Sequence, residues 1–152
     1  MVSMNYWSDQ MPRRILVSFT AFVWMLAIAE MSHADTLTIN LQGVPTAEGT
    51  VLIEILGSEA AFKGEEKAVA SFMQSAQEGT MSFSLTLPAG SYGARIMHDI
   101  NDNGELDANF VGIPSEPWGF SNNATGSFGP PKWQDVQFEL SGDAEQNIRL
   151  NK

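Results

Sequence analysis

The chain has 152 residues, and its 18 acidic and 8 basic side chains give a formal net charge of −10 at pH 7. A surface of this sign repels nucleic acid and anionic lipid, so nucleic acid is excluded as a partner. The chain has no cysteine, which excludes disulfides, cysteine nucleophiles and zinc sites built on thiolates.

Residues 1–34 have the layout of a secretory signal peptide. Arg13 and Arg14 precede the apolar run 15–29, and small residues follow it up to Ala34. The run is shorter than the roughly 20 residues that span a bilayer. We therefore expect cleavage after Ala34, export to the periplasm or the extracellular space, and no stable membrane anchor afterwards. The alternative is that the run is retained as an N-terminal anchor.

Alternation of apolar and polar residues predicts the strands of the mature domain, residues 35–152. Four apolar side chains alternate with serine and threonine in the clearest segment, 80–87, and the stretch 58–68 favours a helical turn. Seven short strands in a chain without cysteine predict a single antiparallel β-sandwich of immunoglobulin-like or transthyretin-like type. The seven segments are 36–42, 49–56, 68–74, 80–87, 91–97, 135–140 and 146–150.

The stretch 98–132 has no sustained period and is too long for an ordinary connection. Loops above about 12–15 residues are uncommon in compact domains and are usually functional or disordered. This one is rich in aromatic residues and poor in lysine and glutamate, which argues against disorder. We expect an ordered functional loop.

The loop begins with a pattern typical of calcium sites. Calcium takes six to eight oxygen ligands, which short Asp and Asn side chains supply from a tightly curled backbone. The expected ligands are Asp99, Asn101, Asn103, the carbonyl group of Glu105, and Asp107. An EF-hand would need a glutamate where Phe110 stands, so this is a different and shorter loop. The same residues also favour Asx turns, which need no ion.

The sequence HDINDNGELDANFVGIPSEPWGFSNNA, with LPAGSYGARIM before it and FGPPKWQDVQF after it, resembles a family of exported bacterial proteins catalogued as Domain of Unknown Function 2141. This resemblance covers nearly the whole mature chain and implies a secreted β-sandwich, but the family has no assigned activity. The residues that match its pattern are His98, Asp99, Asn101, Asn103, Gly104, Leu106, Asp107, Asn109, Gly112, Pro114, Glu116, Gly119, Phe120, Ser121, Asn122 and Asn123.

Further residues of the loop are candidates for ligand contacts, and each also has a structural interpretation. His98, the only histidine left after cleavage, either serves a reaction or bonds the loop backbone. Glu116 could act with Asp99 or Asp107 in glycoside hydrolysis, or could close the loop by hydrogen bonds. Aromatic residues could stack on sugar rings, or could fold under the loop and anchor it to the end of the sandwich. The remaining candidates are Asn109, Trp118, Phe120, Asn122 and Asn123, with Phe128 and Trp133 as further aromatic residues.

The sequence therefore predicts an exported, non-catalytic binding or accessory module with a calcium-type loop, acting on an unknown envelope or extracellular ligand. No catalytic residue is assigned. The alternatives are a calcium-dependent hydrolase acting on envelope glycans and a metal-free scaffold protein.

Export predicts a mature chain that begins at Asp35, because Ala34 ends the expected cleavage site. Mass spectrometry of the envelope fraction measures that N-terminus directly. An uncleaved chain held in the inner membrane would show that the apolar run is an anchor instead.

Overall fold

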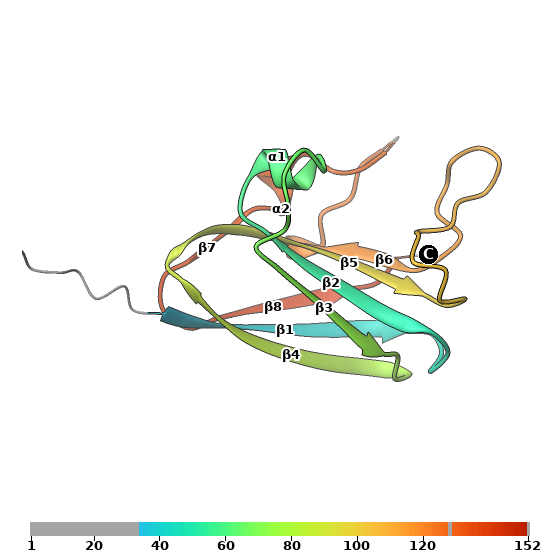
Figure 1. Ribbon diagram of the computed structural model, residues 1–152, viewed down its shortest axis with the longest axis horizontal. Helices are drawn as coiled ribbons and strands as arrows, with labels where there is room; N and C mark the ends of the chain where they lie inside the picture. Colours follow the sequence, from blue (N-terminus) through green and yellow to red (C-terminus); the bar gives the residue numbers. More distant parts are fainter. Residues whose placement is uncertain (1–33, 128, 152) are drawn as a thin grey trace, which may run out of the picture. The chain divides into compact units, whose positions relative to one another are not determined.

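The computed structural model describes residues 34–127 and 129–151, so the expected signal peptide lies outside the described residues except for Ala34. Within them no helix is long and apolar enough to cross a membrane. The elements are β1 (Ala34–Val44), β2 (Thr50–Leu56), α1 (Glu59–Phe62), β3 (Ala70–Ser75), β4 (Gly79–Pro88), β5 (Gly90–Asp99), β6 (Trp118–Phe120), the 3₁₀-helix η1 (Ser121–Asn123), α2 (Trp133–Val136), β7 (Phe138–Leu140) and β8 (Ala144–Arg149) (Figure 1).

The strands form two sheets, which confirms the predicted all-β sandwich. One sheet has the order β4-β1-β8, and the other has the order β3-β2-β5-β6, with β7 also pairing with β5. Neighbouring strands are antiparallel except β1 and β8, which run parallel from Leu37↔Ala144 to Gln42↔Arg149. The chain crosses from one sheet to the other between β7 and β8, and β8 therefore joins β1 without a hairpin.

The core lies between the sheets and follows from the alternation in the sequence. Side chains at every second position of β1, β2 and β5 point inward, and their neighbours point outward. Burial of a leucine or isoleucine side chain contributes about 1.5–3 kcal/mol. The residues without exposed surface in this core are Leu37, Ile39, Leu41, Val51, Ile53, Ile55, Ala94 and Ile148.

Each of the seven predicted segments contains residues of a strand, and α1 lies within the predicted helical stretch. Two local predictions are wrong. The loop expected at 98–132 contains the short strand β6, and Val136 belongs to α2 and not to a strand. Helix α2 packs close to β5 at Gly93. A Cβ added at Gly93 would lie 2.7 Å from Cζ3 of Trp133, which is too close for a real contact. Only glycine leaves room for this contact.

The turn after β6 ties the two sheets together through its side chains. Ser121 Oγ accepts a hydrogen bond from the Ala94 N–H at 2.9 Å and donates one to the Val136 carbonyl. Asn123 behaves as a strand partner of β8, because its Nδ2 donates to the Asn147 carbonyl and its Oδ1 accepts from the Arg149 N–H. Backbone groups that the sheets leave unpaired are thus satisfied by side chains.

Candidate functional site

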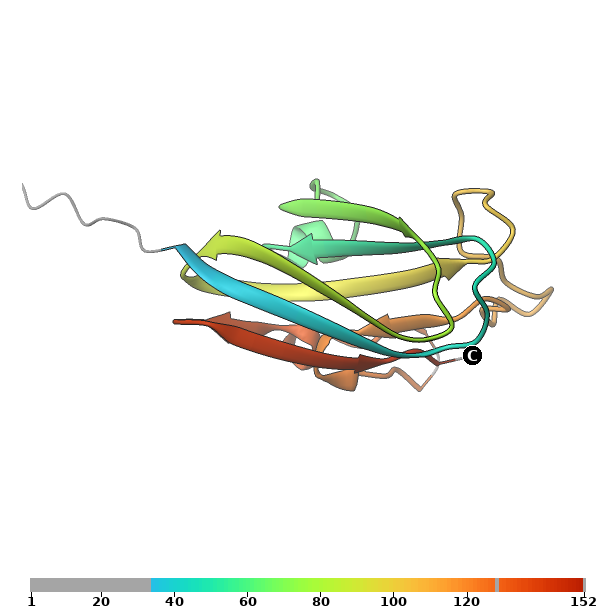
Figure 2. The ribbon, with the colours of Figure 1, turned by 90° about the horizontal axis from the view of Figure 1, so that it is seen from below.

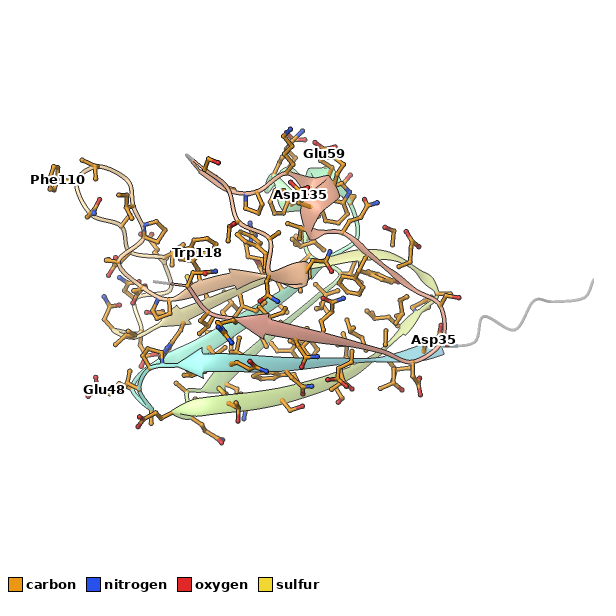
Figure 3. All side chains as sticks on the ribbon, turned by 180° about the vertical axis from the view of Figure 1, so that it is seen from behind. Asp35, Glu48, Glu59, Phe110, Trp118 and Asp135 are labelled. Atoms are coloured by element: carbon orange, nitrogen blue, oxygen red, sulfur yellow. The ribbon has the colours of Figure 1, made fainter. Side chains whose placement is uncertain are left out.

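The long loop leaves the sandwich where β5 ends at Asp99 and returns at Trp118, the first residue of β6. Figure 3 shows it projecting from one end of the sheets, with Phe110 at its far end and Trp118 at its base. A small bridge between Ala108 and Pro114 makes its outer part a tight hairpin. Residues 100–117 are the candidate site, called the projecting loop below.

Asp99 organises the first turn of the projecting loop. Its side chain is 4% exposed, and its two oxygens accept hydrogen bonds from the N–H groups of Asn103 at 3.1 Å and Gly104 at 2.7 Å. Gly104 has a φ of +82° and Asp102 a φ of +56°. Glycine, asparagine and aspartate adopt this left-handed backbone most readily, so the sequence favours the turn.

Asp107 receives the two asparagine side chains. Its Oδ2 accepts from Asn101 Nδ2 at 2.7 Å, and its Oδ1 accepts from Asn103 Nδ2 at 3.1 Å. The amide oxygens face the backbone, since Asn101 Oδ1 accepts from the Asn103 N–H and Asn103 Oδ1 from the Glu105 N–H. Four of the predicted ligand side chains are therefore gathered in one turn. Glu105 contributes its backbone N–H to this turn, whereas the predicted ligand is its carbonyl group.

Glu116 holds the two halves of the projecting loop together. It is 5% exposed, its Oε1 accepts from the Ile100 N–H at 2.8 Å, and its Oε2 accepts from the Asp107 N–H at 3.1 Å. Both carboxylate oxygens thus bind backbone groups on the opposite side of the loop. This is the loop-closing role that the structural interpretation of Glu116 predicts.

His98 is fully buried at the end of β5. Its Nε2 lies 2.7 Å from the Glu48 carbonyl oxygen, so Nε2 carries a hydrogen and donates it to this acceptor. Its Nδ1 has no hydrogen-bond partner among the described residues. The histidine fastens the connection between β1 and β2 to the end of β5. Its role here is structural, but its side chain bonds the backbone of that connection, whereas the predicted bond was to the backbone of the long loop.

The outer hairpin is built on Asn109 and presents apolar side chains to solvent. Asn109 Oδ1 accepts from the N–H groups of Val111 at 3.0 Å and Ile113 at 3.1 Å. Phe110 is 100% exposed, Val111 61% and Ile113 58%. These three residues, together with the exposed Leu106, are called the apolar tip below. The sequence reasoning did not single them out, although the run NFVGIP inside a polar loop is a signal that could have found them.

The aromatic residues near the loop pack against one another. Trp118 is half-buried and its ring centroid lies 5.6 Å from that of the buried Phe120. The ring centroid of Phe62 lies 5.7 Å from that of Phe120 and 6.0 Å from that of Trp133. These rings cluster around Phe62 of α1. Phe120 is thus packed into the sandwich, but against this helix, whereas the prediction placed it beneath the loop. Phe128 lies outside the described residues.

Asn122 has a structural role like that of Asn123. Its Nδ2 donates to the carbonyl groups of Asp135, Val136 and Gln137, at distances of 3.1, 3.2 and 2.9 Å. Both predicted contact residues are thus engaged with the backbone of the sandwich.

The donor set of the projecting loop is made of hard oxygen atoms. It comprises the carboxylates of Asp99 and Asp107 and the amides of Asn101 and Asn103, with the carbonyl group of Glu105 as the predicted fifth ligand. Within residues 34–127 and 129–151, no three His, Cys, Asp or Glu side chains come together in a group able to hold a metal ion. A cation here would depend on amide and carbonyl oxygens, which suits calcium better than a transition metal.

The fold and this loop define a class: β-sandwich domains that carry one ordered, acidic loop with an apolar tip at an end of the sheets. The chain belongs to the bacterial family described as uncharacterized proteins conserved in bacteria, DUF2141, whose family model matches residues 39–149. The family predicted from the sequence is thereby confirmed. Neither the curated proteins nor the solved structures contain a match to this chain.

The two hydrogen bonds of Glu116 generate a stability prediction. Glu116→Gln replaces one acceptor oxygen by an NH2 group, so one buried backbone N–H loses its partner, at a cost of about 1–3 kcal/mol. Glu105→Gln is the matched control, because the same change falls on an exposed side chain of the same loop and should cost less than about 0.5 kcal/mol. Urea denaturation monitored by fluorescence measures both. Equal losses would contradict the role of Glu116.

Proposed function

We propose that this protein is an exported, non-catalytic binding module of the bacterial cell envelope, and that it contacts its ligand through the projecting loop. The observation that carries the proposal is the apolar tip. Phe110 is wholly exposed, with Val111 and Ile113 beside it, on a hairpin fixed by Asn109. The proposal of export rests on the sequence of residues 1–34.

The apolar tip contributes nothing to the fold and exposes apolar surface to water. A soluble domain usually keeps such surface scattered, and a local concentration of it marks an interaction site. The base of the projecting loop is held by buried carboxylates at Asp99 and Glu116. A loop ordered before binding loses less conformational entropy when its ligand docks, which favours affinity. Order and apolar exposure together support a contact surface.

A non-catalytic role is supported by the state of the carboxylates. Glu116 is buried and binds two N–H groups, and both oxygens of Asp99 are engaged in the same way. A general acid in glycoside hydrolysis must instead reach the glycosidic oxygen. Turnover of an envelope glycan by the wild type, lost in a folded Glu116→Gln variant, would establish the hydrolase alternative.

Calcium is the second part of the proposal. The Asn101 and Asn103 amides now direct their nitrogens at Asp107, and a half-turn of each amide would direct its oxygen there instead. Assignment of O and N in an amide depends on its partners, so a cation near Asp107 would favour the turned orientation. With two ligand carboxylates, affinity should resemble that of extracellular modules, on the order of 10⁻⁴–10⁻³ M. A metal-free Asx-turn loop is the competing interpretation.

The apolar tip predicts the outcome of a binding experiment. Phe110→Ser should weaken saturable binding of the labelled protein to isolated envelope fractions at least tenfold, because burial of a phenylalanine contributes about 1.5–3 kcal/mol. Val69→Ser is the control, since Val69 is also exposed but lies outside the loop. No saturable binding by the wild type, or equal binding by both variants, would refute the proposal.

The calcium proposal predicts a change in thermal stability. Calcium at about 10 mM should raise the melting temperature by about 5 °C, as expected near tenfold saturation of a native-state site, and magnesium should do less. Asp107→Asn should diminish the shift, because it removes one of two ligand charges. Asp102→Asn should preserve it, since Asp102 is outside the ligand set and asparagine tolerates its positive φ. Identical melting curves in calcium and in chelator would favour the metal-free loop.

A further inference from the structure

The two flanks of the sandwich differ in whether the outer edges of their strands have hydrogen-bond partners. On the flank of β6 and β8, Trp118 and Asn151 exchange two backbone hydrogen bonds of 2.9 and 2.7 Å, and Asn123 pairs with β8. On the other flank β3 and β4 end their sheets, and the described strands give each of them one neighbour, β2 and β1. Figure 2 shows β4 beside β1 at the edge of the nearer sheet, with β8 on the far side of β1.

Strand β4 lacks the features that usually keep edge strands from pairing. Proteins protect an edge with charged side chains, internal proline, bulges or short strands. β4 spans ten residues, its only proline is the terminal Pro88, and no charged residue occurs from Gly79 to Ala94. The irregularity in its register with β1 falls at its first residues. Most of the strand is therefore a regular, uncharged edge.

The side chains of β4 are also incompletely covered. Phe83 and Leu85 face the core and pack against it, yet they stay half-buried. The alternate positions, Ser82, Ser84 and Thr86, are exposed. On the outer face, Ser82 bonds Asn40 and Ser84 bonds Thr38 of β1. An additional strand would cover the apolar pair and could extend this row of hydroxyl groups on the other side of β4.

We propose that the protein forms a two-fold dimer by antiparallel pairing of β4 with β4 of a second copy, with the axis at Ser84. Opposed residues in an antiparallel ladder share one face, so the axis passes through a residue. With the axis at Ser84, Phe83 of each copy lies opposite Leu85 of the other. Apolar side chains then meet apolar ones and hydroxyls meet hydroxyls, and the two three-stranded sheets become one sheet of six.

The charge distribution favours a second copy over other occupants. A basic partner would be attracted to acidic segments such as residues 99–107, whereas β4 offers it no charge. A lipid surface needs apolar side chains directed outward, and those of β4 are hydroxyls. Two copies carry −10 each, but repulsion between exposed charges is screened beyond roughly 8 Å at physiological salt. An uncharged strand is the place where two such copies can approach.

Disulfide trapping tests the register, because the chain has no cysteine of its own. Ser84→Cys brings two Cα atoms about 4.5–5.5 Å apart across the axis, within disulfide range. Ser82→Cys is the matched control, since its two thiols would be displaced by four residues, about 13 Å along the strand. Oxidation of the purified protein, as the cell exports it, should give a covalent dimer of Ser84→Cys and leave Ser82→Cys largely monomeric. Equal cross-linking, or none in either variant, would overturn the proposal.

Light scattering tests the association itself. The wild type should have twice the monomer mass, and Ser84→Lys should reduce it to the monomer mass, because two ammonium groups would meet at the axis. Thr38→Lys should remain dimeric, since Thr38 lies opposite Ser84 on β1, one strand in from the edge. Circular dichroism checks that both variants fold. A monomeric wild type at about 100 µM, or equal disruption by both lysines, would overturn the proposal.

Discussion

Where the chain leaves a β-sheet, its backbone N–H groups need acceptors other than those of a neighbouring strand. This constraint shapes the features that distinguish this sandwich. A buried N–H without a partner costs about 1–3 kcal/mol, and N–H groups that water can reach do not hold a loop in one conformation. Acceptors within the chain are therefore what orders the eighteen residues 100–117. The acceptors here are side chains: Asp99, Asn101, Asn103, Asn109 and Glu116. The abundance of Asp and Asn in the sequence is thus first a requirement of the backbone.

That requirement also bears on the chemistry of the loop. Carboxylates that bind backbone N–H groups are poorly placed for proton transfer, and the buried acidic residues at the two ends of the projecting loop, Asp99 and Glu116, both bind such groups. Asp107 differs, because its partners are the flexible amides of Asn101 and Asn103. A cation could replace those partners without breaking the backbone contacts of Asp99 and Glu116. A half-turn of either amide would, however, give up the bond from its oxygen to the Asn103 or Glu105 N–H, so binding of an ion is coupled to the conformation of this turn.

The sequence predicted the strands and part of the site for physical reasons that also explain the failures. Alternation arises wherever one face of a strand is buried, so the long strands were recognisable. β6 has only three residues, too few to show a period. Val136, Phe138 and Leu140 alternate by coincidence across a helix and a strand. The turn at Asp99 was predictable because its contacts are local. The pairing of Asn123 with β8 depends on how the sheets meet, and the apolar tip was missed because burial patterns do not report exposed residues.

The same use of side chains as backbone partners also explains the asymmetry between the flanks. Ser121, Asn122 and Asn123 reach across from one sheet to groups of α2 and β8, so the β6/β8 flank is closed within one chain. No comparable polar triplet lies between β3 and β4, where Ala76, Gln77 and Glu78 make the short connection. The outer edge of β4 is consequently open, and only water or another strand can satisfy its unpaired N–H and C=O groups.

Pairing through β4 would also leave each apolar tip free to bind, because the projecting loop leaves from the end of β5 and β4 lies along the flank. A dimer would then present two tips, and two simultaneous contacts raise the apparent affinity for an extended surface without any change in the individual contact.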